Sequence, residues 1–268
     1  MTDQQASGKS AALTYTSYLA LDEILAAQRP RSDEHDEMLF IVIHQVYELW
    51  FKQLLHELDL LQRKLAKVDT AHSVRTLRRA LTILKVVVAQ IDVLETMTPR
   101  QFTSFRERLD AASGFQSGQF RELEAVLGRR DGRMLKPYAE GSTAHDRITA
   151  AMSRPSLFDS FLAYLAGSGY DISATHLNRD VGEQWEAADD VRQVLAQVYR
   201  DDAGPSTVAD LLVDLDEGMQ EWRYRHVKMV ERTIGSKAGT GGSAGAEYLR
   251  STLFHSVFPD LWAVRSDL

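Results

Sequence analysis

Apolar residues recur three and four positions apart along residues 33–68, a stretch that contains neither glycine nor proline. In an α-helix this spacing places them on one face and leaves the polar residues between them on the other. The apolar positions are Phe40, Tyr47, Phe51, Leu54, Leu55, Leu58 and Leu61. The pattern therefore predicts one long amphipathic helix over 33–68.

The same periodicity returns along most of the chain. It predicts helices at 73–95, 99–109, 118–128, 156–167 and 180–200, and a second long helix that follows residues 203–206, with Ser206 as a candidate cap, and ends near Ile234. Only six prolines interrupt the 268 residues. We expect an all-α fold in the form of a multi-helix bundle. Residues 1–268 are expected to form a single domain, with 1–12 as a disordered N-terminal tail.

Composition narrows the classes of partner. The chain carries 31 basic and 38 acidic residues, a formal net charge of −7, which disfavours phosphate backbones and anionic membranes. Its longest unbroken aliphatic and aromatic run, residues 38–43, is far shorter than the roughly 20 residues of a membrane-crossing helix. The first residues lack the basic and apolar stretches of a secretion signal. We expect a cytoplasmic protein that binds neither nucleic acid nor membrane.

The absence of cysteine excludes disulfides and thiolate metal sites, so any metal must be held by nitrogen or oxygen. The eight histidines show no HExxH motif and no pair four positions apart, which argues against zinc-protease and ferritin-like sites. A haem is different, because the porphyrin supplies four nitrogens and the protein need offer only one axial ligand. A solitary histidine is then sufficient.

Two histidines have suitable surroundings. His44 lies one helical turn from Phe40 and Tyr47, and His226 lies one turn from Trp222 and from Val230. Three cations, Arg223, Arg225 and Lys228, are close to His226 and would suit a flat apolar cofactor with carboxylate edges. By pattern alone, the stronger interpretation is that either histidine is a packed, hydrogen-bonded core residue, as histidines on apolar helix faces usually are.

Three further features of the sequence each allow two interpretations. Residues 235–245 contain five glycines and form either a flexible loop or a lid whose Thr240 and backbone amides reach a small carboxylate. Arg106 either faces solvent or binds a carboxylate through two parallel hydrogen bonds. The cluster of Tyr15, Tyr18 and Leu19 belongs either to the core or to an aromatic surface that covers a neighbouring subunit.

Five segments together resemble the successive signature blocks of the tryptophan 2,3-dioxygenase family. They are TYTSYLALDEILAAQ (14–28), HDEMLFIVIHQVYELWFKQLLHELD (35–59), FRERLDAASGFQS (105–117), EWRYRHVKMVERTIGSKAGTGGSAG (221–245) and FPDLWAVRSDL (258–268). Their order and spacing also match, and they extend from about residue 13 to the last residue. Five blocks in register are far more specific than any one of the motifs above.

The resemblance implies a helical haem enzyme in which His226 is the axial ligand of haem b. His44 matches the distal histidine that contacts the indole nitrogen, and Phe40 would pack against the indole ring. Arg106 matches the arginine that binds the substrate carboxylate, and Thr240 matches the threonine at the substrate's polar end.

The resemblance also implies a homotetramer in which Tyr15, Tyr18 and Leu19 complete the pocket of an adjacent subunit. Leu109 and Ser113 match further pocket positions. The implied reaction cleaves the C2–C3 bond of L-tryptophan, or of a close indole amino acid, with dioxygen to give N-formylkynurenine. Two alternatives stay open: insertion of one oxygen atom to form an oxindole, which some relatives catalyse, and a noncatalytic haem- or tryptophan-binding protein.

Overall fold

The protein is helical throughout the part of the chain that the computed structural model describes, namely residues 12–109, 114–235, 237, 249–250 and 253–268, without the side chain of Phe115. Its α-helices are α1 (Tyr15–Leu19), α2 (Leu21–Leu25), α3 (His35–Leu65), α4 (Thr70–Leu94), α5 (Pro99–Arg106), α6 (Gly118–Leu127), α7 (Thr143–Met152), α8 (Leu157–Gly167), α9 (Ala174–Leu177), α10 (Asp189–Asp201), α11 (Gly204–Ile234) and α13 (Pro259–Ala263). These residues contain no strand, which confirms the all-α prediction.

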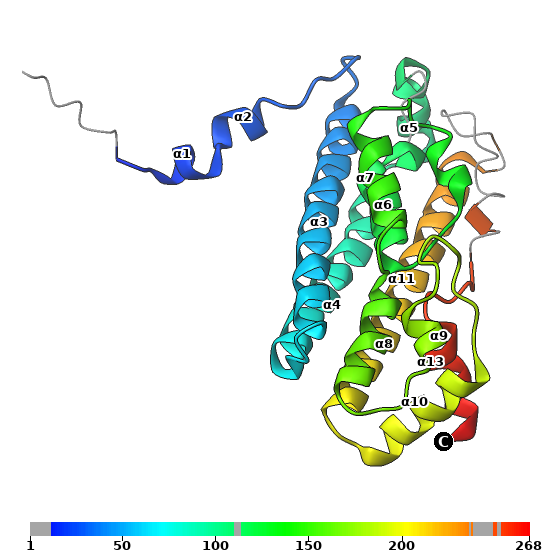
Figure 1. The fold of residues 1–268 in the computed structure, drawn as a ribbon. Coiled ribbons are helices and arrows are strands. Elements are labelled where there is room, and N and C mark those ends of the chain that lie inside the picture. The colour runs from blue at the N-terminus through cyan, green and yellow to red at the C-terminus, as the bar shows by residue number, and fades with distance from the viewer. Residues whose placement is uncertain (1–11, 110–113, 236, 238–248, 251–252) are drawn as a thin grey trace, which may run out of the picture.

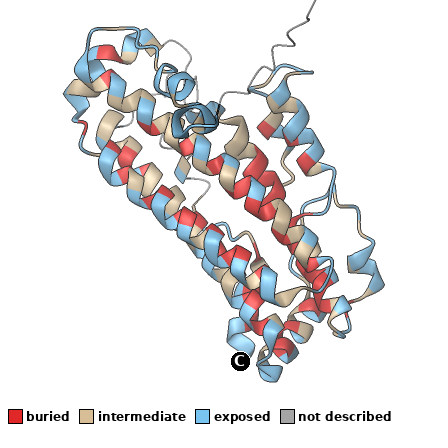
Figure 2. Ribbon diagram, turned by 90° about the vertical axis from the view of Figure 1, so that its left-hand side faces the viewer, coloured by how far each residue is buried: buried red, intermediate tan, exposed pale blue. Residues whose placement is uncertain are grey.

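Three long helices, α3, α4 and α11, form the centre of the bundle. Helix α4 packs against both α3 and α11, while α6 and α8 pack against α3 (Figure 1). The apolar face predicted for residues 33–68 points inward, and its members Phe51, Leu58 and Leu61 are almost completely buried. Figure 2 shows buried residues along the inner sides of the long helices and exposed residues along their outer sides. Burial of these faces supplies most of the driving force for packing.

The ends of these helices follow local capping chemistry more than apolar periodicity. Helix α4 begins at Thr70, three residues before the predicted start, because the Asp69 side chain accepts a hydrogen bond from the backbone N–H of His72. Helix α5 begins at Pro99 after a capping box formed by Thr98 and Gln101. The predictions for 33–68, 73–95 and 99–109 are therefore confirmed, with small shifts at their ends.

The helix predicted over 180–200 was wrong in its first half, because residues 180–188 form a loop before α10. In this loop Trp185 Nε1 and the backbone N–H of Ala188 donate to the buried carboxylate of Asp260, at 2.6 and 2.7 Å. These bonds to a segment far away in the sequence replace local helical hydrogen bonds. The helix can start only at Asp189.

Helix α11 starts at Gly204, within residues 203–206 and not after them as predicted, so Ser206 is not its cap. The N-cap is Ala203, which provides no side-chain hydrogen bond, and Pro205 occupies the first turn, where its missing N–H is not needed. Ser206 lies inside the helix and its hydroxyl donates to the carbonyl of Ala203 at 2.6 Å. The position of the helix thus follows from its apolar face and the proline.

The first two helices form an arm that leaves the bundle (Figure 1). Tyr15 and Tyr18 on α1 are 75% and 71% exposed, and no residue of α1 or α2 is buried. The interpretation of this cluster as ordinary core is therefore wrong for the isolated chain. The predicted tail at 1–12 lies almost entirely outside the described residues.

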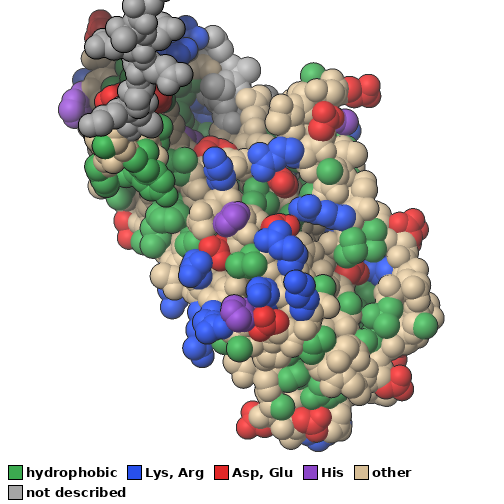
Figure 3. Space-filling model, turned by 60° about the vertical axis from the view of Figure 1, so that its left-hand side comes forward, with side chains coloured by type: hydrophobic (Ala, Val, Ile, Leu, Met, Phe, Trp, Pro, Cys, Tyr) green, Lys and Arg blue, Asp and Glu red, His purple; other side chains and the backbone are tan. Residues whose placement is uncertain are grey.

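The charges on the surface are unevenly distributed. Lys52, Arg75, Arg78 and Lys85 are exposed on α3 and α4. On the face of the molecule that Figure 3 presents, several Lys and Arg side chains lie close together, with acidic and His side chains among them. Each of these two helices therefore buries one face in the bundle and exposes the other to solvent. No helix in the described ranges combines the length and apolar composition that crossing a membrane requires.

Candidate functional site

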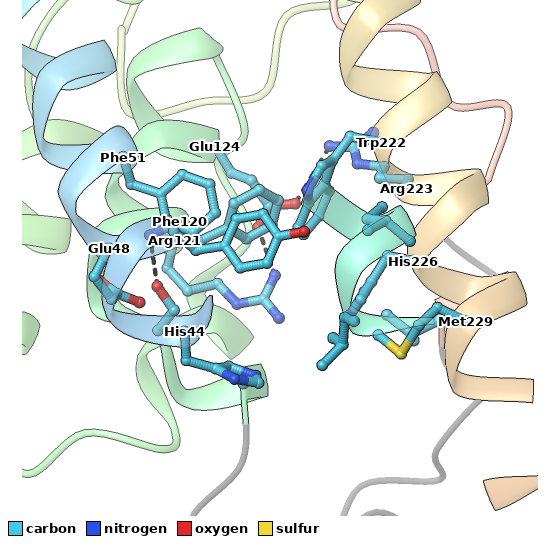
Figure 4. Close-up of a pocket in the computed structure, with 16 residues that line it drawn as sticks. His44, Glu48, Phe51, Phe120, Arg121, Glu124, Trp222, Arg223, His226 and Met229 are labelled. Carbon is cyan, nitrogen blue, oxygen red and sulfur yellow. Dashed lines mark hydrogen bonds and ion pairs between the residues drawn. The ribbon is translucent and has the colours of Figure 1, made fainter. Parts of the chain in front are cut away.

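A cavity lies between α3, α4, α6 and α11, toward the end of the bundle where α4 and α11 end. It contains about 840 Å³ of space not filled by protein atoms, a volume that includes open solvent. His44 of α3 and His226 of α11 both line it, and Figure 4 shows them on opposite sides. Two histidines 182 positions apart in the sequence thus face one space.

His226 is held by an aromatic neighbour on its own helix. Trp222, one turn earlier, stacks on its imidazole with ring centres 5.0 Å apart and an angle of 17° between the planes. Burial, with smaller contributions from the nearby His44 and Arg121, lowers the pKa of His226 to about 4. The imidazole is therefore neutral at physiological pH, which is the form that can donate an electron pair to a metal.

His44 is oriented by the helix on which it lies. Its Nδ1 is 2.7 Å from the carbonyl oxygen of Phe40, and the Phe40 and His44 rings are 4.2 Å apart. Burial lowers the pKa of His44, although the Phe40 carbonyl and Glu48 oppose this shift. When Nδ1 donates its proton to the carbonyl, Nε2 remains as an acceptor. A Cβ added to Gly114 would lie 3.7 Å from this Nε2, so the backbone of Gly114 passes close to the imidazole.

Aromatic rings form one wall of the cavity. Phe120 lies 4.5 Å from Trp222 and 5.4 Å from Phe51, measured between ring centres, and all three rings border the space. Tyr47 Oη and Trp222 Nε1 on the same wall are buried and have no hydrogen-bond partner among the described residues. Buried polar groups are normally paired, so this wall suits a flat, largely apolar ligand that also carries hydrogen-bond acceptors.

A buried carboxylate organises three arginines at the edge of the cavity. Glu124 lies 2.5 Å from Arg121, 3.0 Å from Arg129 and 3.3 Å from Arg223, each measured between a guanidinium nitrogen and a carboxylate oxygen. Burial alone would raise the pKa of Glu124, but the three guanidinium groups outweigh it and hold this pKa below the ordinary 4.5. One negative charge thus fixes three positive charges that come from different parts of the chain.

We expect Glu124→Gln to lower the free energy of unfolding by about 1–3 kcal/mol at pH 7, the usual contribution of hydrogen bonds to charged groups. The pKa of Glu124 is lower in the folded than in the unfolded protein. The ionised carboxylate therefore stabilises the folded protein above pH 4.5, and this contribution is lost as the pH falls through the pKa of Glu124 in the folded protein. Urea unfolding between pH 3 and 8 measures the difference in unfolding free energy between Glu124→Gln and the unmodified protein. If this difference in unfolding free energy does not become smaller at acidic pH, the assignment is contradicted. Glu140→Gln, on the exposed surface, is the control.

The other predicted site residues are distributed around this cavity or lie outside the described ranges. Phe40 packs against His44, whereas Arg106 at the end of α5 and Leu109 are half-buried and do not border the cavity. Ser113 and Thr240 lie outside the described residues. The structure therefore brings together His44, Phe40 and His226.

Of the three cations expected beside His226, only Arg223 borders the cavity. Arg225 pairs with Asp92 at 2.5 Å and Lys228 pairs with Glu231 at 3.0 Å. The prediction for these two residues was wrong because they lie one position before and two positions after His226, on other faces of the helix. Arg223 is three positions away and shares its face.

The sequence interpretation missed Arg121, Glu124 and Phe120 of α6. A signal was present, because Glu122 and Glu124 lie among the apolar residues of the segment ELEAVL (122–127), and the structure buries all six residues. Buried glutamates need cationic or hydrogen-bonding partners. Which partners they have depends on tertiary contacts, so the spacing of residues alone did not identify this cluster.

Comparisons with known proteins extend over the whole chain. The family model described as "Tryptophan 2,3-dioxygenase" matches residues 1–166 and 180–268. A protein of that name from Anaeromyxobacter dehalogenans is 65% identical over 268 residues, which is 100% of both chains. One from Herpetosiphon aurantiacus is 56% identical, covering 97% of this chain and 100% of its own, and one from Caulobacter vibrioides is 43% identical, covering 96% and 98%.

Proposed function

The chain belongs to the tryptophan 2,3-dioxygenase family, and from this membership we propose that it cleaves the indole C2–C3 bond of L-tryptophan with dioxygen to give N-formylkynurenine. The observation that carries the proposal is the placement of His44 and His226 on opposite sides of one aromatic cavity. One histidine can hold a cofactor while the other meets a substrate that lies between them. The names of the relatives favour this reaction over insertion of a single oxygen atom.

The cavity fits haem b. His226 supplies a buried, neutral imidazole, and the aromatic wall suits a flat macrocycle. Arg121 and Arg223 border the cavity and suit the carboxylates of haem. Trp222 Nε1 and Arg223 Nε are buried donors without a partner among the described residues. His226 would hold the iron of haem, and haem, when bound, would supply a centre that binds and activates dioxygen.

The protein's own groups position the substrate. His44 Nε2 can accept the hydrogen bond of the indole N–H, while the Phe40 ring packs against the indole. The atoms of tryptophan and dioxygen together equal those of N-formylkynurenine, so the reaction releases no net proton. His44 is therefore an orienting group and need not act as an obligatory base.

The remaining substrate contacts are assigned to four other residues. We assign the substrate carboxylate to Arg106, its remaining polar contacts to Thr240, and additional lining of the pocket to Leu109 and Ser113. These roles rest on the matched family blocks. A guanidinium group binds a carboxylate through two parallel hydrogen bonds, which fix the direction of the amino acid relative to its ring.

The number of oxygen atoms in the product tests the proposal directly. The protein is incubated with L-tryptophan, a reductant and ¹⁸O-labelled dioxygen, and the product is analysed by mass spectrometry. Ring cleavage adds two labelled atoms, and oxindole formation adds one. A product with one labelled atom, or no oxygen consumption, would overturn the proposed reaction.

Arg106→Leu should lower kcat/KM for L-tryptophan by about 10- to 100-fold, the range expected for the loss of hydrogen bonds to a charged group. Cofactor content should stay unchanged, because Arg106 does not border the cavity that holds His226. Steady-state oxygen uptake and the absorbance of the bound cofactor measure the two effects. Arg100→Leu, exposed on the same helix, is the matched control. Equal loss of cofactor and turnover would instead make Arg106 a structural residue.

We also propose that the protein acts as a homotetramer in which the α1 arm closes the pocket of an adjacent subunit. Two exposed tyrosines, Tyr15 and Tyr18, on an arm that leaves the bundle support this arrangement, with the half-buried Leu19 beside them. An isolated chain rarely exposes such side chains together without a partner. The organisation of residues 1–268 as one domain and the cytoplasmic location stay predictions.

A further inference from the structure

Tyr47 carries a buried hydroxyl that neither the packing of the bundle nor the proposed reaction uses. It lies on α3 three positions after His44, so the two side chains share one face of the helix, and both border the cavity that also holds His226. Tyr47 is 9% exposed, and its Oη has no hydrogen-bond partner among the described residues. A buried hydroxyl without an acceptor costs stability, because its bonds to water are lost and not replaced.

The ring of Tyr47 is fixed by packing rather than by hydrogen bonding. It stacks on Phe51, with ring centres 6.1 Å apart and an angle of 18° between the planes. Phe51 in turn contacts Phe120 and Trp222, whose ring centres lie 5.4 and 6.2 Å from its own. These contacts hold the hydroxyl in one place at the cavity wall. It is therefore available to a ligand without any rearrangement of the ring.

The hydroxyl of Tyr47 keeps its proton. Burial raises its pKa well above the ordinary value of 10, and Asp92 adds to the shift while Arg225 opposes it. Asp92 is itself paired with Arg225, and no carboxylate in the described part of the chain accepts a hydrogen bond from Tyr47. Tyr47 is thus a neutral donor, and its acceptor must come from whatever occupies the cavity.

Haem offers few acceptors to such a donor. Its four pyrrole nitrogens bind the iron, and most of its edge is hydrocarbon, so its two carboxylates are its only strong acceptors. Each carboxylate oxygen can accept more than one hydrogen bond. Tyr47 can therefore bind a carboxylate that also meets Arg121 or Arg223 on the cavity lining. A hydrogen bond to an ionised acceptor is stronger than one between two neutral groups.

We propose that Tyr47 is a positioning residue for haem, and that its hydroxyl donates a hydrogen bond to a haem carboxylate. A single axial ligand such as His226 leaves the macrocycle free to rotate about the bond between iron and nitrogen, so contacts at the edge must fix its direction. The phenol supplies one such contact. This inference rests on haem as the proposed cofactor, but it does not depend on which oxygenated product is formed.

Tyr47→Phe keeps the stacked ring and removes only the hydroxyl. The haem-loaded variant should lose haem to an excess of apomyoglobin about tenfold faster than the unmodified protein, the size expected for one hydrogen bond to a charged group. The change in Soret absorbance measures this transfer. In urea, the cofactor-free variant should be at least as stable as the cofactor-free unmodified protein, because it no longer buries an unbonded hydroxyl. A purely structural hydroxyl would instead make the cofactor-free variant less stable.

Haem dimethyl ester, in which both carboxylates are esterified, identifies the acceptor. A neutral ester accepts a much weaker hydrogen bond than a carboxylate. With this haem, the rates of loss from Tyr47→Phe and from the unmodified protein should differ by only about twofold or less. The matched control is Tyr138→Phe, because Tyr138 Oη is also buried without a described partner but does not border the cavity. It should lose ordinary haem at the rate of the unmodified protein.

Three outcomes would overturn the role of Tyr47 and leave the proposed oxygenation intact. They are equal rates of haem loss from Tyr47→Phe and the unmodified protein, a tenfold difference that persists with the ester, and a cofactor-free variant that is less stable in urea. In the second case the hydroxyl would bind something other than a carboxylate. If the unmodified protein bound no haem at all, the proposed function would fail, and the role of Tyr47 would fail with it.

Discussion

Replacing His226 by alanine is expected to remove the bound haem and to lower the rate of tryptophan oxygenation by at least about 1,000-fold. The imidazole is the proposed axial ligand, and it is buried, neutral and stacked on Trp222. His226 is the only histidine of α11, and His44, the other histidine that borders the cavity, lies on its opposite side. The Soret absorbance of the purified protein and its oxygen uptake with L-tryptophan measure the two losses.

A rescue experiment separates ligation from a structural role of His226. Alanine leaves space for a free imidazole molecule, so added imidazole should restore part of the Soret band in His226→Ala, whereas it cannot repair a misfolded bundle. Circular dichroism should show unchanged helix content. His56→Ala, an exposed position on α3, is the control and should keep its haem. If His226→Ala kept its full haem content, another residue would have to be the iron ligand.

The helices that surround this site could be predicted from the sequence where their apolar faces are long. Helices α3 and α11 each extend over 31 residues, and a face of that length yields a clear periodicity. Helix α7 was missed because it is short and buries only Ile148 and Ala151. Its start depends on Ser142, whose side chain accepts a hydrogen bond from the backbone of His145. Local capping, rather than a periodic face, defines this helix.

The candidate site was predictable as separate parts but not as an assembly. His44 and His226 each lie on an apolar face, a pattern that is more typical of a packed core residue, and only the matched family blocks connected them. Their common cavity is a consequence of how α3 and α11 pack around α4. Glu124 and its three arginines depend on the same packing. Sequence spacing within one helix carries no information on such contacts.

The helix that carries His226 is anchored ten residues earlier by a buried carboxylate. Asp216 is completely buried, and its Oδ2 accepts hydrogen bonds from the backbone N–H groups of Val257 and Phe258 and from Trp262 Nε1, at 2.7, 2.9 and 2.8 Å. Its Oδ1 accepts from Gln220 at 3.0 Å. This one side chain therefore ties the C-terminal segment to α11.

Asp216→Ala should lower the free energy of unfolding by about 3 kcal/mol or more, because it leaves three donors of the C-terminal segment without their acceptor. For a chain of this size, the melting temperature should fall by about 6 °C or more. Asp216→Asn should cost only about 1 kcal/mol, since its amide oxygen can still accept while Gln220 reorients. Thermal and urea unfolding measure both variants against Asp214→Ala, an exposed position on the same helix. If Asp216→Ala were no less stable than Asp214→Ala, the C-terminal segment would be held by its apolar contacts alone, and the carboxylate would not be its anchor.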